Sequence, residues 1–598
     1  MKLSRLYSNT PDRFAAVSFA PGLNAVVAEI RVPENRNKDT HNLGKTTLGR
    51  VIDFCLLSGR DPNFFLFKHQ NLFGDFVFFL EIQLLDDSYI TVRRPVKEAT
   101  KISFKRHDKR GKDFSELPET QWDHANVAIE KAQDLLDGAL DLRDLKPWRY
   151  RKIISYMLRA QDDFREVFQL KKFSGPHSNW KPFLAHLLGF NAKIIAEHYA
   201  KDEELTKKKD EEEIIKRELG GSVGDISKIE GILLLKQTEA EKKQKVLDAF
   251  DFRKADKDKT RLVVDELDTT IARLNGERYS LMQNKRKITA SLEDEEILFD
   301  PKNASELFGQ AGVVFAGQIK KDFEQLIAFN RAITDERRVY LKEELAEVDT
   351  ELKRVNAELV ELGRKRSASL SFLSGADVFA KYKQATDELV TLRADITSLE
   401  RQREFLRRLQ DLRSTIRTLA EQRSHLQTQI EADVENQNTT KTSKFSAIRL
   451  FFSEIVEEVI DRKGLLSVAP NQQGHLEFKA EILDDSGNTT SADLGFTYRK
   501  LLCVAFDLAV TRAHLDGRYP RFVFHDGIFE SLDDRKKQNL LEILRSYAAL
   551  GIQQTITLID SDLPTLPQGE GAFLADSEVV LRLHDQDESG RLFRMQPW

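Results

Sequence analysis

The chain of 598 residues contains little cysteine and no long hydrophobic run. Its two cysteines, Cys55 and Cys503, exclude a disulfide framework and a four-cysteine zinc site within one chain. No apolar run approaches the roughly 20 residues that span a membrane. Residues 1–14 hold no apolar stretch of the signal-peptide type. We therefore expect a soluble, cytoplasmic protein with no membrane partner.

The chain also lacks a large excess of either positive or negative charge. It has 92 Lys and Arg and 97 Asp and Glu, which gives a formal net charge of −5. This balance argues against a generally basic nucleic-acid coat and leaves a local basic strip open. Charged residues make up 32% and hydrophobic residues 40%. Such a blend indicates long solvated helices beside a globular part.

Proline is nearly missing from the middle of the chain. Nine of the 15 prolines fall between Pro11 and Pro182 and five between Pro470 and Pro597, with Pro301 alone in between. Proline removes a backbone donor and clashes with the preceding helical turn, so this distribution suits continuous helix. Apolar residues in this stretch recur four and three apart, as in a coiled-coil seam: Leu341, Leu345, Val348, Leu352, Val355, Leu359 and Leu362.

The helical pattern breaks around Pro301, in a segment with three glycines. The simplest interpretation is an antiparallel intramolecular coiled coil, with bends at Gly220–Gly224 and Ser367–Asp377. A parallel dimeric rod is the alternative, but folding back would bring the two globular-looking ends together. The predicted divisions are an N-terminal half-head at 1–195, an outgoing arm at 196–299, a tip at 300–324, a returning arm at 325–440 and a C-terminal half-head at 441–598.

The N-terminal part reads as strand, polar loop, Gly44-Lys45-Thr46 and helix, the order of a phosphate-binding loop. Gly44 allows close backbone approach, and the amides that begin the helix point at phosphates. Lys45 would meet the β- and γ-phosphates, and the Thr46 hydroxyl would hold Mg²⁺. The full pattern has a glycine where this chain has Asp39, so a chance Gly-Lys-Thr stays open as an alternative.

The C-terminal part adds a β-rich run that ends in Asp526, as in a nucleotide-binding sheet that holds a magnesium shell. A second β-rich run follows at Gln553–Asp560. Before both, Ser491–Ala513 reads as a small, polar loop that enters an apolar helix. An ordinary strand-end aspartate is the alternative for Asp526 alone, and the shared order with Gly44-Lys45-Thr46 argues against it.

These motifs, in this order around a coil, resemble the SMC/RecN/RecF-like ABC ATPases. The resemblance covers the whole chain in organisation and short motifs in residues. Five runs are most similar to the ATPase of bacterial three-component phage-defence systems: VSFAPGLNAVVAE, HNLGKTTLGRVIDFCL, RKIISYMLRAQDDF, FEQLIAFNRAITDERRVYL and FVFHDGIFESLDD. The resemblance implies an α/β ABC-type ATPase head, formed by the N- and C-terminal segments and split by a long antiparallel α-helical coiled-coil hairpin.

The resemblance also implies site residues. Walker A corresponds to Gly44, Lys45, Thr46 and Thr47, with Asn42 in the loop. Gln161 corresponds to the Q-loop glutamine, Asp526 to the Walker B aspartate and Asp533 to the D-loop aspartate. The signature motif, which in these ATPases reaches the nucleotide of a second head, corresponds to the segment that contains Gly495 and Lys500, so the resemblance implies that both residues bind nucleotide. Mg²⁺ would be held by Thr46, Gln161 and Asp526, with ATP as the nucleotide.

Two departures affect hydrolysis. The family's catalytic glutamate directly follows the Walker B aspartate, and here that position is Gly527. Glu530 is the nearest carboxylate, and it reaches the site only if the loop turns inward. The switch histidine falls near Asp560 and Asp562. His525 is more simply a packed strand histidine than a catalytic one.

The expected function is an ATP-driven clamp or sensor on DNA that dimerises through its heads and works with effector subunits in anti-phage defence. Two alternatives stay open: a nucleotide-gated scaffold with little hydrolysis, and a DNA-repair ATPase. A structural coil with a vestigial head is a further rival. The basic runs Leu170–Phe173 and Lys207–Lys209 support DNA only indirectly, because such runs are usually solvated faces.

Overall fold

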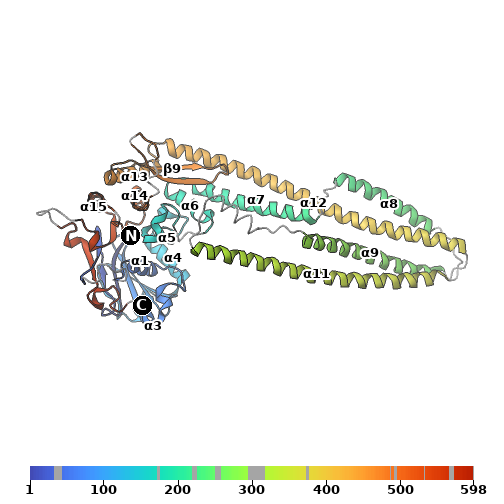
Figure 1. The fold of residues 1–598 in the computed structure, drawn as a ribbon, viewed down its shortest axis with the longest axis horizontal. Helices are drawn as coiled ribbons and strands as arrows, with labels where there is room; N and C mark the ends of the chain where they lie inside the picture. The colour runs from blue at the N-terminus through green and yellow to red at the C-terminus, as the bar shows by residue number, and fades with distance from the viewer. Residues whose placement is uncertain are drawn as a thin grey trace. The chain divides into compact units, whose positions relative to one another are not determined.

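The computed structural model describes residues 1–32, 43–170, 175–218, 225–248, 257–293, 317–371, 376–484, 486–489, 495–530, 532–564, 572–596 and 598. The chain divides into two units (Figure 1). One unit, called the head below, combines Met1–Asp202 with Gln422–Trp598, and the other, called the coil, is Glu203–Glu421. The two ends of the chain thus belong to one unit.

Five parallel strands form the central sheet of the head, in the order β13-β3-β12-β11-β8. Strands from the two ends of the chain are neighbours in it, so neither end could form this sheet alone. Most residues of the three central strands are buried, as expected for a parallel sheet covered on both faces. The strands are β3 (Leu23–Glu29), β8 (Leu158–Arg159), β11 (Phe522–Asp526), β12 (Gln553–Ile559) and β13 (Val579–His584).

A second, antiparallel sheet has the order β2-β1-β4-β5-β6-β7. Helix α1 (Lys45–Cys55) contacts β11 and β12 of the parallel sheet and β4 and β5 of the antiparallel one. The helix is thereby held by both sheets. The antiparallel strands are β1 (Lys2–Ser8), β2 (Val17–Ser18), β4 (Val77–Gln83), β5 (Tyr89–Pro95), β6 (Lys101–His107) and β7 (His124–Ala128).

Helices and one further hairpin complete the head. Helix α14 (Phe496–Ala513) is buried from Lys500 to Thr511, because it packs against α13, β11 and the short 3-10 helix η5. The hairpin is β9 (Gly464–Pro470) with β10 (Leu476–Ile482). Further helices of the head are α2 (Phe65–Lys68), α3 (Gln70–Phe73), α4 (Ile129–Leu140), α5 (Tyr150–Met157), η5 (Gln161–Arg165), α6 (His177–Leu187), α13 (Lys444–Ile460) and α15 (Asp534–Ala549).

Long helices make up the described coil, and they pair antiparallel within the chain, as the hairpin interpretation predicts. Ion pairs fix the direction: Lys285–Asp349 and Arg354–Glu277 join α9 and α11 at 2.7 and 3.1 Å. Ion pairs also join α12 to α7 and α8 in antiparallel order. The helices are α7 (Ala192–Glu218), α8 (Ile226–Asp248), α9 (Lys257–Glu293), α11 (Gly317–Ser371) and α12 (Ala376–Thr439).

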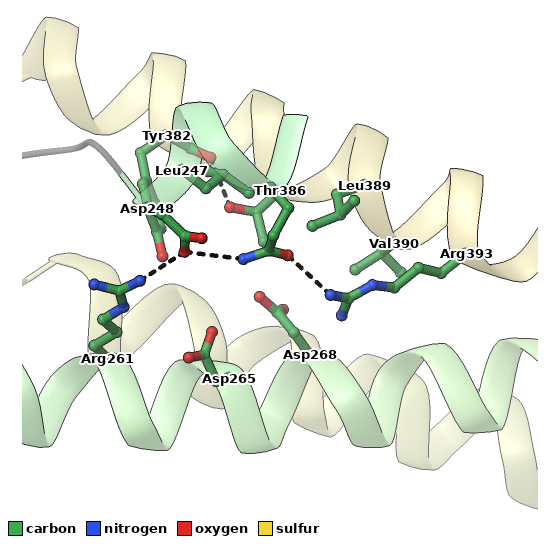
Figure 2. Close-up of a pocket in the computed structure, with 11 residues that line it drawn as sticks. Leu247, Asp248, Arg261, Asp265, Asp268, Tyr382, Thr386, Leu389, Val390 and Arg393 are labelled. Carbon is green, nitrogen blue, oxygen red and sulfur yellow. Dashed lines mark hydrogen bonds and ion pairs between the residues drawn. The ribbon is translucent and has the colours of Figure 1, made fainter. Parts of the chain in front are cut away.

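The two helix pairs of the coil meet at a polar cavity of about 20 Å³, called the elbow below (Figure 2). A hydrogen-bonded chain crosses it from Arg261 of α9 through Asp248 and Gln244 of α8 to Arg393 of α12. Buried Arg366 of α11 ion-pairs with both Asp268 of α9 and Asp387 of α12. The cavity has room for a single water molecule and not for an organic ligand.

Several predictions fall outside the described residues: Asn42, most of the predicted tip, the bend at Gly220–Gly224 and the signature residues before Gly495. Helix α11 ends at Ser371 and α12 begins at Ala376, inside the second predicted bend. The predicted division at residue 195 falls within α7. In the described part of the chain, no helix is long and apolar enough to cross a membrane.

Candidate functional site

The start of helix α1 brings the Gly-Lys-Thr motif to the carboxyl edge of the parallel sheet. Gly44, just before the helix, has a φ of +105°. A Cβ there would lie 2.6 Å from the Cβ of Leu592, which is far inside van der Waals contact. Glycine is therefore required at this position, both for its left-handed backbone and for the close approach.

Thr46 and Asp526 lie in direct contact, although 480 positions separate them in the sequence. The Thr46 hydroxyl donates a hydrogen bond of 2.6 Å to Oδ2 of Asp526 at the end of β11. Thr557 of the neighbouring strand β12 donates to the other carboxylate oxygen. A hydroxyl beside a carboxylate is a donor set that suits Mg²⁺, a cation usually held by one or two carboxylates together with phosphates and water.

No cluster of three or more His, Cys, Asp or Glu side chains in the described residues could hold a metal ion. The Thr46–Asp526 pair fits a cation that is shared with a bound phosphate.

Lys45 is buried, and its ammonium has no hydrogen-bond partner among the described residues. Burial lowers the pKa of Lys45 from its usual value, and the carboxylates of Asp526 and Glu530 act in the opposite direction. A buried, unpartnered ammonium is unfavourable unless an anion reaches it. Together with the helix amides, it makes this edge of the sheet an anion site that suits phosphate groups.

Gln161 and Glu530 also meet at this edge. Nε2 of Gln161, at the start of η5, donates a hydrogen bond of 2.8 Å to Oε1 of Glu530. Nζ of Lys500 lies 3.1 Å from the other oxygen, Oε2. Glu530 thus turns inward and has both carboxylate oxygens engaged within its own head.

A largely buried network, centred on the fully buried Arg159, supports the Gln161 segment. Arg159 makes two contacts of 2.7 Å with the Asp507 carboxylate of α14 and donates to the carbonyls of Asp163, Glu166 and Val167. Burial opposes its charge, but Asp507 raises the pKa of Arg159 above the usual value. His525 Nε2 lies 3.1 Å from Asp507, which agrees with a packed strand histidine.

The other candidate residues are placed as follows. Asp533 caps the start of α15 through a 3.0 Å hydrogen bond from the backbone of Lys536, and its side chain is exposed. Gly495 directly precedes α14. Thr47 lies in the first turn of α1, half-buried. Asp560 accepts a hydrogen bond from the backbone of Ile30, and Asp562 from that of Ile559.

Three features of the site were missed at the level of sequence: the Thr557 hydroxyl, the Lys500–Glu530 contact and the Arg159–Asp507 pair. Thr557 could have been inferred, because β11 and β12 are both β-rich runs of a parallel sheet and their ends meet at one edge. The contacts of Lys500 and Arg159 depend on how α14 packs, and no local pattern reports that.

A family model and several solved structures match the chain. The family, described as an uncharacterised protein conserved in bacteria (DUF2326), matches residues 455–597. No curated protein matches. One similar structure is the Smc head domain with a coiled coil and joint from Pyrococcus yayanosii, with 14% identity and a TM-score of 0.35 over 93% of this chain and 92% of that one.

A second is the Smc head domain with an extended coiled coil, bound to the C-terminal domain of ScpA, from Pyrococcus furiosus. It has 12% identity and a TM-score of 0.31, over 94% of this chain and 90% of that one.

Proposed function

We propose that the head is an ABC-type ATPase site that binds and hydrolyses ATP with Mg²⁺. The observation that carries this proposal is the buried, unpartnered ammonium of Lys45 beside the Thr46–Asp526 pair. These groups supply what a Mg²⁺-bound triphosphate needs, namely a cation for the phosphates and oxygen ligands for the metal.

Each side chain then has a defined task. Lys45 neutralises phosphate charge, and Thr46 and Asp526 hold the metal, with Gln161 beside them. The bound nucleotide supplies the phosphoanhydride bond that is cleaved. Glu530 orients the attacking water and accepts its proton, because it is the carboxylate that the loop after β11 turns into the site.

The wider proposal is that two heads join around nucleotide and that the protein acts on DNA as an ATP-driven clamp or sensor. Effector subunits would work with it in anti-phage defence. Support for DNA is weak in the coil, because Lys207 and Lys208 ion-pair with Glu203 and Glu211 of their own helix. DNA contact therefore stands as an expectation from the resemblance, and DNA repair is an alternative role.

A second candidate function is a nucleotide-gated scaffold that hydrolyses little ATP. Gly527 favours it, because the position directly after Asp526 carries no side chain. Both functions require nucleotide binding, and they differ in whether Glu530 supports turnover.

The test is ATP turnover with and without linear DNA in the wild type, Lys45→Ala and Glu530→Gln. The clamp predicts turnover that DNA stimulates and that both variants abolish. Nucleotide binding that needs Lys45, with no turnover in the wild type, would select the scaffold. If the wild type binds no nucleotide, the ATPase proposal is wrong.

A further inference from the structure

The turn after Asp526 is shaped to admit Glu530. Gly527 has a φ of +68°, a left-handed conformation that residues with a Cβ rarely adopt. A Cβ at this position would lie 2.6 Å from Oε1 of Glu530 and 2.8 Å from Nε2 of Gln161. The missing side chain therefore leaves the space in which the Glu530–Gln161 contact forms.

Lys500 fixes the same turn from the other side. Its ammonium donates a hydrogen bond of 2.6 Å to the carbonyl oxygen of Gly527 and lies 3.1 Å from Oε2 of Glu530. The side chain of Lys500 is 3% exposed, so its ammonium is shielded from solvent and depends on these contacts. The ammonium also lies 5.6 and 5.2 Å from the ring centroids of Phe164 and Phe496.

We propose that Lys500 is a positioning residue that acts within its own head, where it holds the turn at Gly527 and aims the Glu530 carboxylate at the nucleotide site. This inference rests on the proposed ATPase function. Among the described residues, its ammonium contacts two oxygens of one loop, the Gly527 carbonyl and the Glu530 carboxylate, and the inference assigns Lys500 to this loop.

The inference predicts different effects on the turnover number, kcat, and on the affinity for ATP, Kd. A residue that only aims the carboxylate affects the rate of the chemical step and leaves nucleotide affinity unchanged. A displacement of about 1 Å at a reacting group can lower turnover by about 10²-fold. Lys500→Met should therefore lower kcat by about 10²-fold, with an unchanged Kd for ATP. Lys500→Arg, which restores a cationic donor, should recover part of the loss.

The matched control is Lys181→Met in the full-length chain. Lys181 is also a buried lysine that donates to a backbone carbonyl, that of Leu476 at 2.7 Å, and it lies near an aromatic ring. It contacts no residue of the site in the described chain. Its substitution should lower stability and leave kcat unchanged.

A second pair of variants tests the turn without changing the charge. Gly527→Ala should lower kcat, because its Cβ displaces the ends of Glu530 and Gln161. Gly111→Ala introduces similar backbone strain, with a φ of +76°, but its Cβ would meet no atom within 4 Å. It should leave kcat unchanged.

The measurements are steady-state ATP turnover, binding of a fluorescent ATP analogue and thermal unfolding. Reduced kcat with unchanged affinity in Lys500→Met and Gly527→Ala supports the inference. Weaker nucleotide binding in Lys500→Met, or wild-type kcat in both variants, overturns it. If Lys500→Met does not fold, the kcat and ATP affinity of Gly527→Ala and Lys500→Arg test the inference instead. A wild type without turnover contradicts the proposed hydrolysis itself, which separates that failure from a failure of the Lys500 inference.

Discussion

The head and the coil use charged residues in opposite ways. In the head, Arg159 and Asp507 are fully buried and bonded at two points, and Lys45 is buried without a hydrogen-bond partner among the described residues. In the coil, cross-helix pairs such as Lys285–Asp349 are largely exposed, at 45% and 39%. Exposed pairs contribute about 0–1 kcal/mol each and mainly favour one register. Buried charges in the head instead position groups at one edge of a sheet.

The elbow is the exception within the coil. Arg366 and Asp268 are both 8% exposed, and Nε of Arg366 lies 2.7 Å from Oδ1 of Asp268. The two atoms are not in hydrogen-bonding geometry. Burial therefore outweighs the attraction of Arg366 and raises the pKa of Asp268 to about 6. The elbow therefore buries a charged pair, as the head does, whereas the other coil pairs named above are largely exposed.

The largest effect is expected from Glu530→Gln in the head. A positioned general base typically contributes 10²–10⁴-fold, so we expect ATP turnover to fall by at least about 10²-fold. Nucleotide binding should persist, because Lys45, Thr46 and Asp526 are unchanged. Steady-state turnover and nucleotide binding, measured on the same preparation, check this. Turnover at the wild-type rate would remove Glu530 from the chemistry.

The elbow gives the next largest effect, and it depends on pH. The pKa of Asp268 is raised from 3.8 to about 6, so the folded coil favours the protonated form. Its contribution to stability is full below about pH 4 and is lost as the pH rises through about 6, a change of roughly 3 kcal/mol. Asp268→Asn removes this dependence, because the amide does not titrate.

The measurement is urea unfolding of the full chain between pH 4 and 7, followed by helical circular dichroism. The free energy of unfolding of wild type minus Asp268→Asn should decrease with rising pH. Exposed Glu266, on the same helix but not among the residues that line the cavity, provides the control Glu266→Gln. Parallel curves for wild type and Asp268→Asn would contradict a buried carboxyl at the elbow.

Lys45→Met should affect stability and function in opposite directions. It removes a buried cation that lacks a hydrogen-bond partner among the described residues, so the nucleotide-free head should gain about 1–2 kcal/mol. Lys181→Met should lose stability, since Lys181 has a backbone partner. Thermal unfolding without nucleotide compares the two. Destabilisation by Lys45→Met would mean that its ammonium has a protein partner.

Much of the coil and part of the candidate site were predictable from the sequence. The coil follows from a repeating apolar pattern, and Val355 of that seam is fully buried. The contact between Thr46 and Asp526 follows from topology, because the ends of parallel strands meet at one edge. The inward turn of Glu530 was only a hypothesis, since it depends on the φ of a single glycine. The place of Lys500 was inferred from the motif, which implied a nucleotide contact and not a contact with Glu530.

The smallest effect is expected at Asp533. Asp533→Ala removes the N-cap of α15 and should lower stability by about 1 kcal/mol. Ser443→Ala removes the equivalent cap of α13 and serves as the control. If Asp533 has the D-loop role as well, turnover falls in Asp533→Ala and stays unchanged in Ser443→Ala. Equal turnover in both variants would show that Asp533 acts as a helix cap and has no D-loop role.

The proposed function requires that the buried ammonium of Lys45 belongs to a nucleotide site that includes a metal. Its most direct test is the titration of wild type and Lys45→Met with a fluorescent ATP analogue, with Mg²⁺ and with EDTA. We predict binding by the wild type that weakens with EDTA, and binding by Lys45→Met that is roughly 10- to 100-fold weaker, since one charge-assisted contact contributes about 1.5–3 kcal/mol. Equal binding by the two proteins, or no binding by the wild type, would contradict the account.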